Sequence, residues 1–270
     1  MQNLRTGQFY GQTNATLRLP GMTLTDTEYT HERVDWHYHD NAYFTFIVQG
    51  KLIEGNKKET YHCSTGSLLF HHWQEPHYNR KPQGYTRGFH LEFAKEGPED
   101  FRRVLEQLQG SIKIVNPATK IIFYKILQET KINDDTQPIA IPALIWQALS
   151  TILPRPPKAG VRQPGWVNQI KELLHDGGEE KRSLENLSHA LQIHPVHLSR
   201  GFPKYFNCTL GDYLRKIKLE KALALLADPN LSLTEIAFAC GFADQSHFIR
   251  CFKACHGLRP SLYRRLIFAR

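Results

Sequence analysis

Histidine side chains are spaced through residues 36 to 79 in a way that suits ligand or metal binding. His37 and His39 alternate in the run W-H-Y-H, and His77 follows in P-H-Y-N. Three imidazoles can bind a transition metal ion, or they can exchange hydrogen bonds with a small polar ligand. Both alternatives require that these residues lie close together in the folded chain.

A second set of chemically active side chains belongs to an internal repeat. H-L-S-R-G-F, His197 to Phe202, returns as H-F-I-R-C-F, His247 to Phe252, and S-L-E-N-L-S-H-A returns upstream as S-L-T-E-I-A-F-A. Each unit has the signals of a capped helix, a tight turn and a second helix with an outward arginine. The repeat predicts two helix-turn-helix units, residues 183–206 and 232–255, that read two successive major grooves of DNA.

We expect the outer faces of the two second helices to contact DNA. Guanidinium and amide groups pair with guanine and adenine edges, whereas other polar groups hold phosphates and set the register. Arg200 and Arg250 are the strongest candidates for base contacts. The expected DNA-binding residues are Val196, His197, Ser199, Arg200, Lys204, Gln245, Ser246, His247, Ile249, Arg250 and Lys253.

Local signals in the second unit define where its helices begin. Ser232 and Glu235 form an S-x-x-E capping box at the start of its first helix. Gly241 suits a turn residue with positive φ, and the next helix is expected to begin near Asp244. These signals agree with one another, so the helix-turn-helix pattern is more regular in the second unit than in the first.

The first unit departs from this regularity. Ser183 is the expected N-cap of its first helix, and Pro195 suits the first turn of its second helix. Pro203, however, removes a backbone donor and crowds the carbonyl of Ser199. We therefore expect a kink or an early break before Tyr205.

A helix from Thr209 to Leu226 is predicted between the two units, with Thr209 as its cap. At 1.5 Å per residue it is about 25 Å long, which is comparable to one DNA turn of about 34 Å. Its basic residues either touch the DNA backbone or form an ordinary solvated face. They are Arg215, Lys216, Lys218 and Lys221.

The first 95 residues predict an all-β domain. Short runs rich in β-branched and aromatic residues, such as Ala42–Val48, Ser67–His71 and Gly88–Phe93, are separated by turn signals. Closely spaced short strands are typical of a barrel or sandwich. We expect aromatic residues in its interior, namely Trp36, Tyr38, Tyr43, Phe44, Phe46, Phe70 and Trp73.

Helical spacing replaces the strand pattern from about Glu99. Three apolar helices are predicted, the last from Ile141 to Leu153. They either pack on the β domain or form a dimer interface. Four prolines between Pro154 and Pro164 then favour an extended linker.

The predicted fold class is α+β multidomain. We expect a ligand-sensing and dimerisation domain over residues 1–153, a linker over 154–165 and an all-α DNA-binding domain over 166–270. The charge supports this division. Residues 1–155 hold 17 Lys/Arg and 16 Asp/Glu, whereas residues 156–270 hold 17 Lys/Arg and 10 Asp/Glu. Most of the total formal charge of +8 therefore lies in the second segment. A basic domain attracts phosphate backbones.

The N-terminus has no apolar signal segment, and no run of about 18 apolar residues occurs. With five cysteines in a chain of this kind, reduced thiols are expected. These features predict a cytoplasmic protein without membrane segments.

Residues from about 166 to 267 resemble the DNA-binding domain of the AraC/XylS family of bacterial transcription regulators. The resemblance is closest from Ser232 to Tyr263, where the capping box, turn glycine, Arg-x-Phe core and terminal Gly-x-x-Pro-x-x-Tyr are in register. It implies a transcription activator with an N-terminal sensor, a homodimer, and RNA polymerase as a partner. Gly201 and Pro203 depart from the family pattern.

The N-terminal histidines resemble the two motifs of cupins. In metal-binding cupins, that resemblance implies a carboxylate about four residues after the histidine pair, and here Tyr43 stands at that position. We therefore expect no metal and no cofactor. The expected small-molecule site consists of Trp36, His37, His39, Tyr43 and His77.

Together these features predict a sequence-specific DNA-binding transcription regulator that responds to a small-molecule effector, binds double-stranded DNA and is not an enzyme. The alternative is a metal-dependent cupin enzyme fused to a DNA-binding module. A DNA-repair protein that shares the helical domain is disfavoured, because Cys63 stands alone in the N-terminal region.

Overall fold

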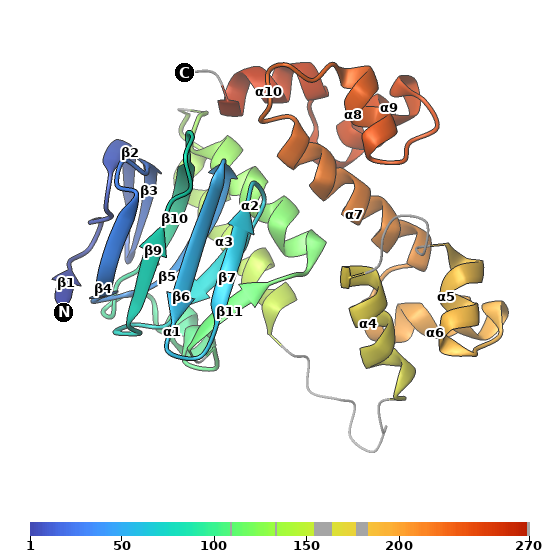
Figure 1. Ribbon diagram of the computed structural model, residues 1–270, viewed down its shortest axis with the longest axis horizontal. Coiled ribbons are helices and arrows are strands. Elements are labelled where there is room, and N and C mark those ends of the chain that lie inside the picture. Colours follow the sequence, from blue (N-terminus) through green and yellow to red (C-terminus); the bar gives the residue numbers. More distant parts are fainter. Residues whose placement is uncertain (109, 133, 154–163, 177–182, 269–270) are drawn as a thin grey trace.

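The computed structural model describes residues 1–108, 110–132, 134–153, 164–176 and 183–268 (Figure 1). The N-terminal part contains β1(Gln2–Leu4), β2(Gln12–Leu19), β3(Met22–Glu28), β4(Arg33–His39), β5(Ala42–Gln49), β6(Lys51–Asn56), β7(Thr60–Ser64), β8(Leu68–His71), β9(His77–Arg80), β10(Arg87–Phe93), α1(Glu99–Leu105), β11(Ser111–Ile114), α2(Pro117–Glu129) and α3(Gln137–Ile152). The C-terminal part contains α4(Trp166–Asp176), α5(Leu184–Leu191), α6(Pro195–Phe206), α7(Leu210–Leu225), α8(Leu233–Ala239), α9(Gln245–His256) and α10(Pro260–Phe268).

The strands form two sheets, as the alternating sequence pattern predicts. The larger sheet has the order β11-β8-β5-β10-β3-β2, and the smaller has the order β1-β4-β9-β6-β7. Because side chains alternate along a strand, each strand presents one set of residues to the space between the sheets and the other set outward. We call the space between the two sheets the barrel interior.

The outer face of the larger sheet is apolar, and it carries the main core. Phe44 and Phe46 of β5 and Phe89 and Leu91 of β10 are almost fully buried there. Helices α2 and α3 cover this face (Figure 1). Ile126, Ile145 and their apolar neighbours supply the other side of the core, so the expectation that these helices pack on the β domain is confirmed.

The prediction that aromatic residues fill the barrel interior is wrong for most of the residues named. Phe44, Phe46 and Phe70 belong to the apolar core beneath the helices, while Trp36 is 40% exposed. The reason is the strand period of two: in β5 the alternate residues, Tyr43 and Thr45, face the barrel interior instead.

The helical part divides into two clusters. Helices α4, α5, α6 and the start of α7 enclose their own apolar core, which includes Ile170, Leu187, Leu198 and Phe202. The expected linker, residues 154–165, lies almost entirely outside the described residues. Among the described residues, no helix has the length and apolar character needed to cross a membrane.

Helices α7 and α10, which flank the second helix-turn-helix unit, pack against the N-terminal part. Leu219 and Leu223 of α7 and Ile267 of α10 belong to the same continuous core as α2. Tyr263 donates its hydroxyl to the carbonyl of Tyr124 at 3.2 Å. Among the described residues, α4–α6 and the start of α7 form one apolar cluster, and the rest of α7 and α8–α10 belong to the cluster that contains α2.

Polar contacts reinforce this packing. Lys120 of α2 and Glu220 of α7 form an ion pair at 3.0 Å. Arg87, at the start of β10, donates two hydrogen bonds to Asp26 and a third to the carbonyl of Ile267 at 3.2 Å. Burial raises the pKa of Asp26, but Arg87 and Lys131 lower it by a larger amount, so the net shift is downward. This charged group therefore joins the two sheet strands to α10.

Candidate nucleic-acid interface and ligand site

The second unit has the predicted helix-turn-helix geometry. Ser232 accepts from the Glu235 amide at 3.2 Å, and the Glu235 carboxylate accepts from the Ser232 amide at 2.8 Å, which completes the capping box. Gly241 has φ of 69° in the turn. Asp244 caps α9 by accepting from the amide of His247 at 2.7 Å. The sequence signals for these helix ends are confirmed.

The buried face of α9 leaves a defined outer face. Phe248 and Phe252 are fully buried. The exposed residues are Ser246, His247, Arg250 and Lys253, and the half-buried residues are Gln245 and Ile249. The predicted DNA-contact residues of the second unit are therefore all at least partly exposed, although Ile249 also packs against the main core.

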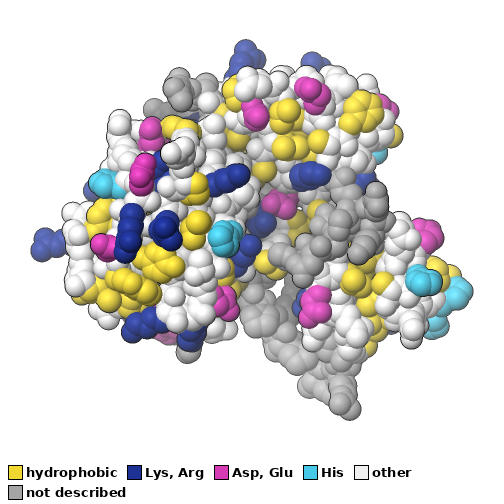
Figure 2. Space-filling view, in the orientation of Figure 1, with side chains coloured by type: hydrophobic (Ala, Val, Ile, Leu, Met, Phe, Trp, Pro, Cys, Tyr) yellow, Lys and Arg dark blue, Asp and Glu magenta, His cyan; other side chains and the backbone are white. Residues whose placement is uncertain are grey.

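The first unit presents a similar face on α6. Leu198 and Phe202 are fully buried, while the predicted contact residues Val196, His197, Ser199, Arg200 and Lys204 are all exposed. Neither Arg200 nor Arg250 has a hydrogen-bond or ion-pair partner among the described residues. Figure 2 shows histidine side chains gathered on the surface over α5 and α6, where His189, His194 and His197 are exposed.

The expected early break in α6 is wrong. The helix continues through Pro203 to Phe206, and the Asn207 amide donates to the Pro203 carbonyl at 3.0 Å. The carbonyl that Pro203 leaves without a helical partner belongs to Ser199, which is exposed, so water can satisfy it. Gly201 has a separate packing reason, since a Cβ there would lie 3.2 Å from the ring of Trp166.

Two lysines of α7 make hydrogen bonds within the protein that were not among the alternatives considered from the sequence. Lys218 donates to the carbonyl of Gly241, and Lys221 donates to the carbonyl of Ala239. These carbonyls lie at the end of α8, where cations are favoured by the helix dipole. The two lysines therefore stabilise the turn of the second unit.

The barrel interior brings four of the five predicted ligand residues together. The imidazole nitrogens of buried His37, His39 and His77 lie within 4.8 Å of one another, and the Tyr43 hydroxyl lies 2.9 Å from Nε2 of His77. Trp36 does not join them, because it points to the opposite side of β4 and packs on Tyr78 at 5.2 Å between ring centroids.

Hydrogen bonds determine the state of two of these histidines. Nδ1 of His37 lies 2.8 Å from the carbonyl of Asp35, and Nδ1 of His77 lies 3.1 Å from that of Glu75. Since a carbonyl only accepts, each Nδ1 carries the proton. Burial lowers the pKa of His37 and lowers that of His77 to about 3. Both rings are neutral, their Nε2 atoms are acceptors, and Tyr43 donates to His77.

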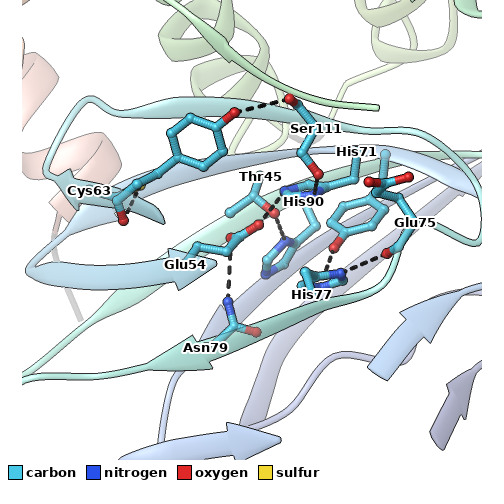
Figure 3. A network of polar contacts seen from close by, with 11 residues as sticks. Thr45, Glu54, Cys63, His71, Glu75, His77, Asn79, His90 and Ser111 are labelled. Carbon is cyan, nitrogen blue, oxygen red and sulfur yellow. Dashed lines mark hydrogen bonds and ion pairs between the residues drawn. The ribbon is translucent and has the colours of Figure 1, made fainter. Parts of the chain in front are cut away.

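Sequence reasoning missed a neighbouring polar group (Figure 3). Glu54 of β6 lies 2.8 Å from Nε2 of His71, and Nδ1 of His90 lies 3.2 Å from the hydroxyl of Thr45. Burial raises the pKa of Glu54, and the attraction of His71 more than offsets this effect. Alternating polar residues in otherwise apolar strands, such as His90 and Glu92, were the available signal.

The donor set meets only part of what a transition metal requires. Nitrogen ligands at about 2.1 Å from an ion are its usual neighbours, and His37, His39 and His77 are the residues that would hold it. The fourth position is taken by Tyr43, whose burial keeps its pKa well above 10. Its neutral hydroxyl already donates a hydrogen bond to Nε2 of His77, and the carboxylate of Glu54 is paired with His71. The interior therefore fits hydrogen bonding to a small ligand better than metal coordination.

The N-terminal segment closes one side of this interior. Phe9 stacks on His90, with ring centroids 3.7 Å apart and planes inclined by 8°, and it also contacts His39 at 4.9 Å. The Gly7 amide donates to Glu92 at 2.6 Å. A ligand that reached His39 or His90 from this side would have to displace Phe9.

Comparison with known proteins identifies the helical part. Residues 187–266 match a family described as a helix-turn-helix domain. The chain is similar to the HTH-type transcriptional regulator GbdR of Pseudomonas aeruginosa, with 32% identity over 101 residues, which cover 37% of this chain and 27% of the relative. It is also similar to the uncharacterized HTH-type transcriptional regulator YobQ of Bacillus subtilis, with 25% identity over 192 residues, 65% of this chain and 80% of the relative.

A solved domain matches the same region. It is the C-terminal domain of the two-component response regulator yesN from Fusobacterium nucleatum, at 36% identity over 36% of this chain and 98% of that chain, with a TM-score of 0.33. A TM-score of this size adds no structural argument. The chain spans between 27% and 48% of the length of the first curated relatives it matches.

Proposed function

Because the C-terminal part of this chain belongs to the AraC/XylS family of helix-turn-helix domains, we propose that the whole protein is a sequence-specific DNA-binding transcription regulator. In this proposal α6 and α9 enter two adjacent major grooves. The observation that carries it is the pair of helices whose exposed faces hold the repeated arginines, joined by α7. The relatives are named transcription regulators, which supports a role other than that of an enzyme.

The geometry of α7 supports simultaneous binding by both units. Its 16 residues correspond to about 24 Å of helix, and α6 and α9 lie near its opposite ends (Figure 1). The positive charge of residues 156–270 would hold the protein on the DNA backbone and make binding depend on salt. Base contacts by Arg200 and Arg250 would then supply sequence preference.

We further propose that the barrel interior receives a small-molecule effector. Its neutral imidazoles, the Tyr43 hydroxyl and the unpartnered Nε2 of His90 support a polar ligand with hydrogen-bonding groups. Effector binding would shift the population between two states with different affinity for DNA. In this proposal the protein acts in the cytoplasm as a transcription activator and contacts RNA polymerase.

A homodimer is part of the same proposal. The outer face of α3 carries Ile139 at 76% and Trp146 at 39% exposure, and these residues lie on one side of the helix at a spacing of seven. Two copies packed through α3 would bury both. The expected division into residues 1–153, 154–165 and 166–270 also remains a proposal, with the qualification that α7–α10 share a core with α2.

The experiment that tests this function is a selection from random double-stranded DNA by the full-length protein at near-physiological salt. We expect a motif of two parts whose centres are about 10 base pairs apart. The matched control is Arg200→Ala/Arg250→Ala, which should select no motif while it retains salt-dependent binding. Wild-type binding without an enriched motif would contradict the proposed function.

A further inference from the structure

One side chain on α8 contacts the side chain that begins α9. The Thr234 hydroxyl donates to Oε1 of Gln245 at 2.6 Å, a normal length for an O–H···O hydrogen bond. The residues on either side are held as well, because Ser232 and Glu235 cap α8 and Asp244 caps α9. The hydrogen bond therefore spans two helix starts whose positions are already defined.

This contact determines which end of the Gln245 amide is available. With Oε1 held by Thr234, the NH2 group remains as the outward donor. Gln245 is half-buried, and its neighbour Ser246 and the residue Arg250 are exposed on the same face. An NH2 donor in the major groove seeks an acceptor, such as N7 of a purine, O6 of guanine or O4 of thymine.

We propose that Thr234 is a positioning residue that orients Gln245, so that the second unit discriminates one base pair through the Gln245 NH2 group. This inference rests on the proposed DNA-binding function. Without the hydroxyl, the terminal amide rotates freely and presents oxygen or NH2 in turn. Discrimination at that base pair then falls, while contacts made by Arg250 and Lys253 stay.

The first unit has no equivalent pair. Alignment of the repeat places Glu185 at the position of Thr234 and Pro195 at the position of Gln245. Pro195 has no side-chain donor, so the first unit cannot read a base in this way. The inference therefore predicts that only the half of the DNA site bound by the second unit responds to changes at this helix pair.

The test is a double-mutant cycle on the full-length protein. Thr234→Val removes the hydroxyl at nearly constant shape, Thr234→Ser keeps a hydroxyl, and Gln245→Ala removes the amide. Each variant, and Thr234→Val/Gln245→Ala, is titrated against the DNA site selected by the wild type and against every single base-pair substitution of it. Glu185→Val in the first unit is the matched control for an exposed valine at the corresponding helix position.

We expect Thr234→Val to lower discrimination about fivefold or more at one base pair, the same pair at which Gln245→Ala acts. The double variant should equal Gln245→Ala, and Thr234→Ser should equal the wild type. Glu185→Val should leave that base preference unchanged.

Three results would overturn the inference while the DNA-binding function stands. The first is that the effects of Thr234→Val and Gln245→Ala are additive. The second is that Thr234→Val keeps the wild-type base preference. The third is that Gln245→Ala loses affinity equally on every DNA sequence, which would place the amide on a phosphate. A wild type that selects no motif would instead contradict the function on which the inference rests.

Discussion

At the scale of single residues, the same side-chain type has different roles according to what surrounds it. Burial keeps His37 and His77 neutral, and a backbone carbonyl holds each Nδ1 proton, so that each Nε2 is an acceptor. Exposed His197 and His247 instead lie on the predicted DNA face. Lys218 and Lys221 act as caps for α8. The residue type predicted the available chemistry, and the neighbours selected which of its uses applies.

Arg200 and Arg250 are the residues for which we expect the largest losses of DNA affinity. If each reads a guanine, replacement by alanine costs about 1–3 kcal/mol on the selected site. The loss should be restricted to one base pair for each arginine, as measured by titration against single-substituted sites. Lys253→Ala serves as the control, since loss of a phosphate contact weakens binding on all sequences. Unchanged affinity in both arginine variants would refute the assignment.

Tyr43 should control whether the barrel interior accepts a metal. We expect wild-type protein purified without a histidine tag to contain no stoichiometric transition metal, because a neutral phenol holds Nε2 of His77. Tyr43→Glu supplies a carboxylate next to three imidazoles and should bind Zn²⁺ more tightly, as measured by calorimetry and elemental analysis. Stoichiometric iron, zinc or manganese in the wild type would show that the hydroxyl does not prevent coordination.

At the scale of elements, the helix ends were predicted best. Ser183, Thr209 and Ser232 each cap the helix that follows, through a side-chain oxygen that accepts from the third residue of the helix. Such caps involve residues only three positions apart, so they depend little on the rest of the fold. Pro203 was the exception: its missing amide did not end the helix, and α6, which buries Leu198 and Phe202 in the turns before Pro203, continues to Phe206.

The cap of α8 supports a prediction about stability. Ser232→Ala removes the acceptor for the Glu235 amide, and we expect it to lower the free energy of unfolding by about 1 kcal/mol. Ser232→Thr retains the hydroxyl and should have a smaller effect. Chemical denaturation monitored by circular dichroism would measure both. Equal stability of Ser232→Ala and wild type would mean that the capping hydrogen bond contributes nothing in the full chain.

At the scale of the whole molecule, the second unit and the N-terminal part share a core, while the first unit has a separate one. Arg87 lies on β10, three residues before His90, and reaches the last turn of α10. Arg87 therefore connects β10 directly to α10, the helix that follows the second unit in the chain. The first unit is joined to it through α7 and its own small core.

We expect Arg87→Ala to destabilise the protein by about 3 kcal/mol, because the buried Asp26 carboxylate loses its two-hydrogen-bond partner. Amide hydrogen exchange in α10 should become faster, since the Ile267 carbonyl loses a donor. Lys131→Ala, which removes only the more exposed partner of Asp26, should have a smaller effect. Unchanged exchange in α10 would indicate that Arg87 does not connect the two parts.

Stability should fall as the pH is lowered from about 6.5. Burial, together with repulsion from Lys125, lowers the pKa of His256 to about 3 in the folded protein, whereas an unfolded histidine titrates near 6.5. Between these values the unfolded state binds more protons, so each such histidine costs about 1.4 kcal/mol per pH unit. His256→Phe should flatten the dependence of the unfolding free energy on pH between 6.5 and 5. An unchanged slope would mean that His256 is protonated in the folded state.

The sequence by itself determined the features that depend on near neighbours: the two helix-turn-helix units, their caps, the face of each second helix and the β-to-helix change near Glu99. Each is set by spacings of two to four residues, where propensity and capping act directly. Only the tertiary structure decided the composition of the barrel interior, where Glu54, His71 and His90 join His37 and His77. These residues come from separate strands, and which of them meet depends on strand order and register. The shared core of α2 with α7 and α10 was equally hidden, because an apolar helix face does not specify which other face will cover it.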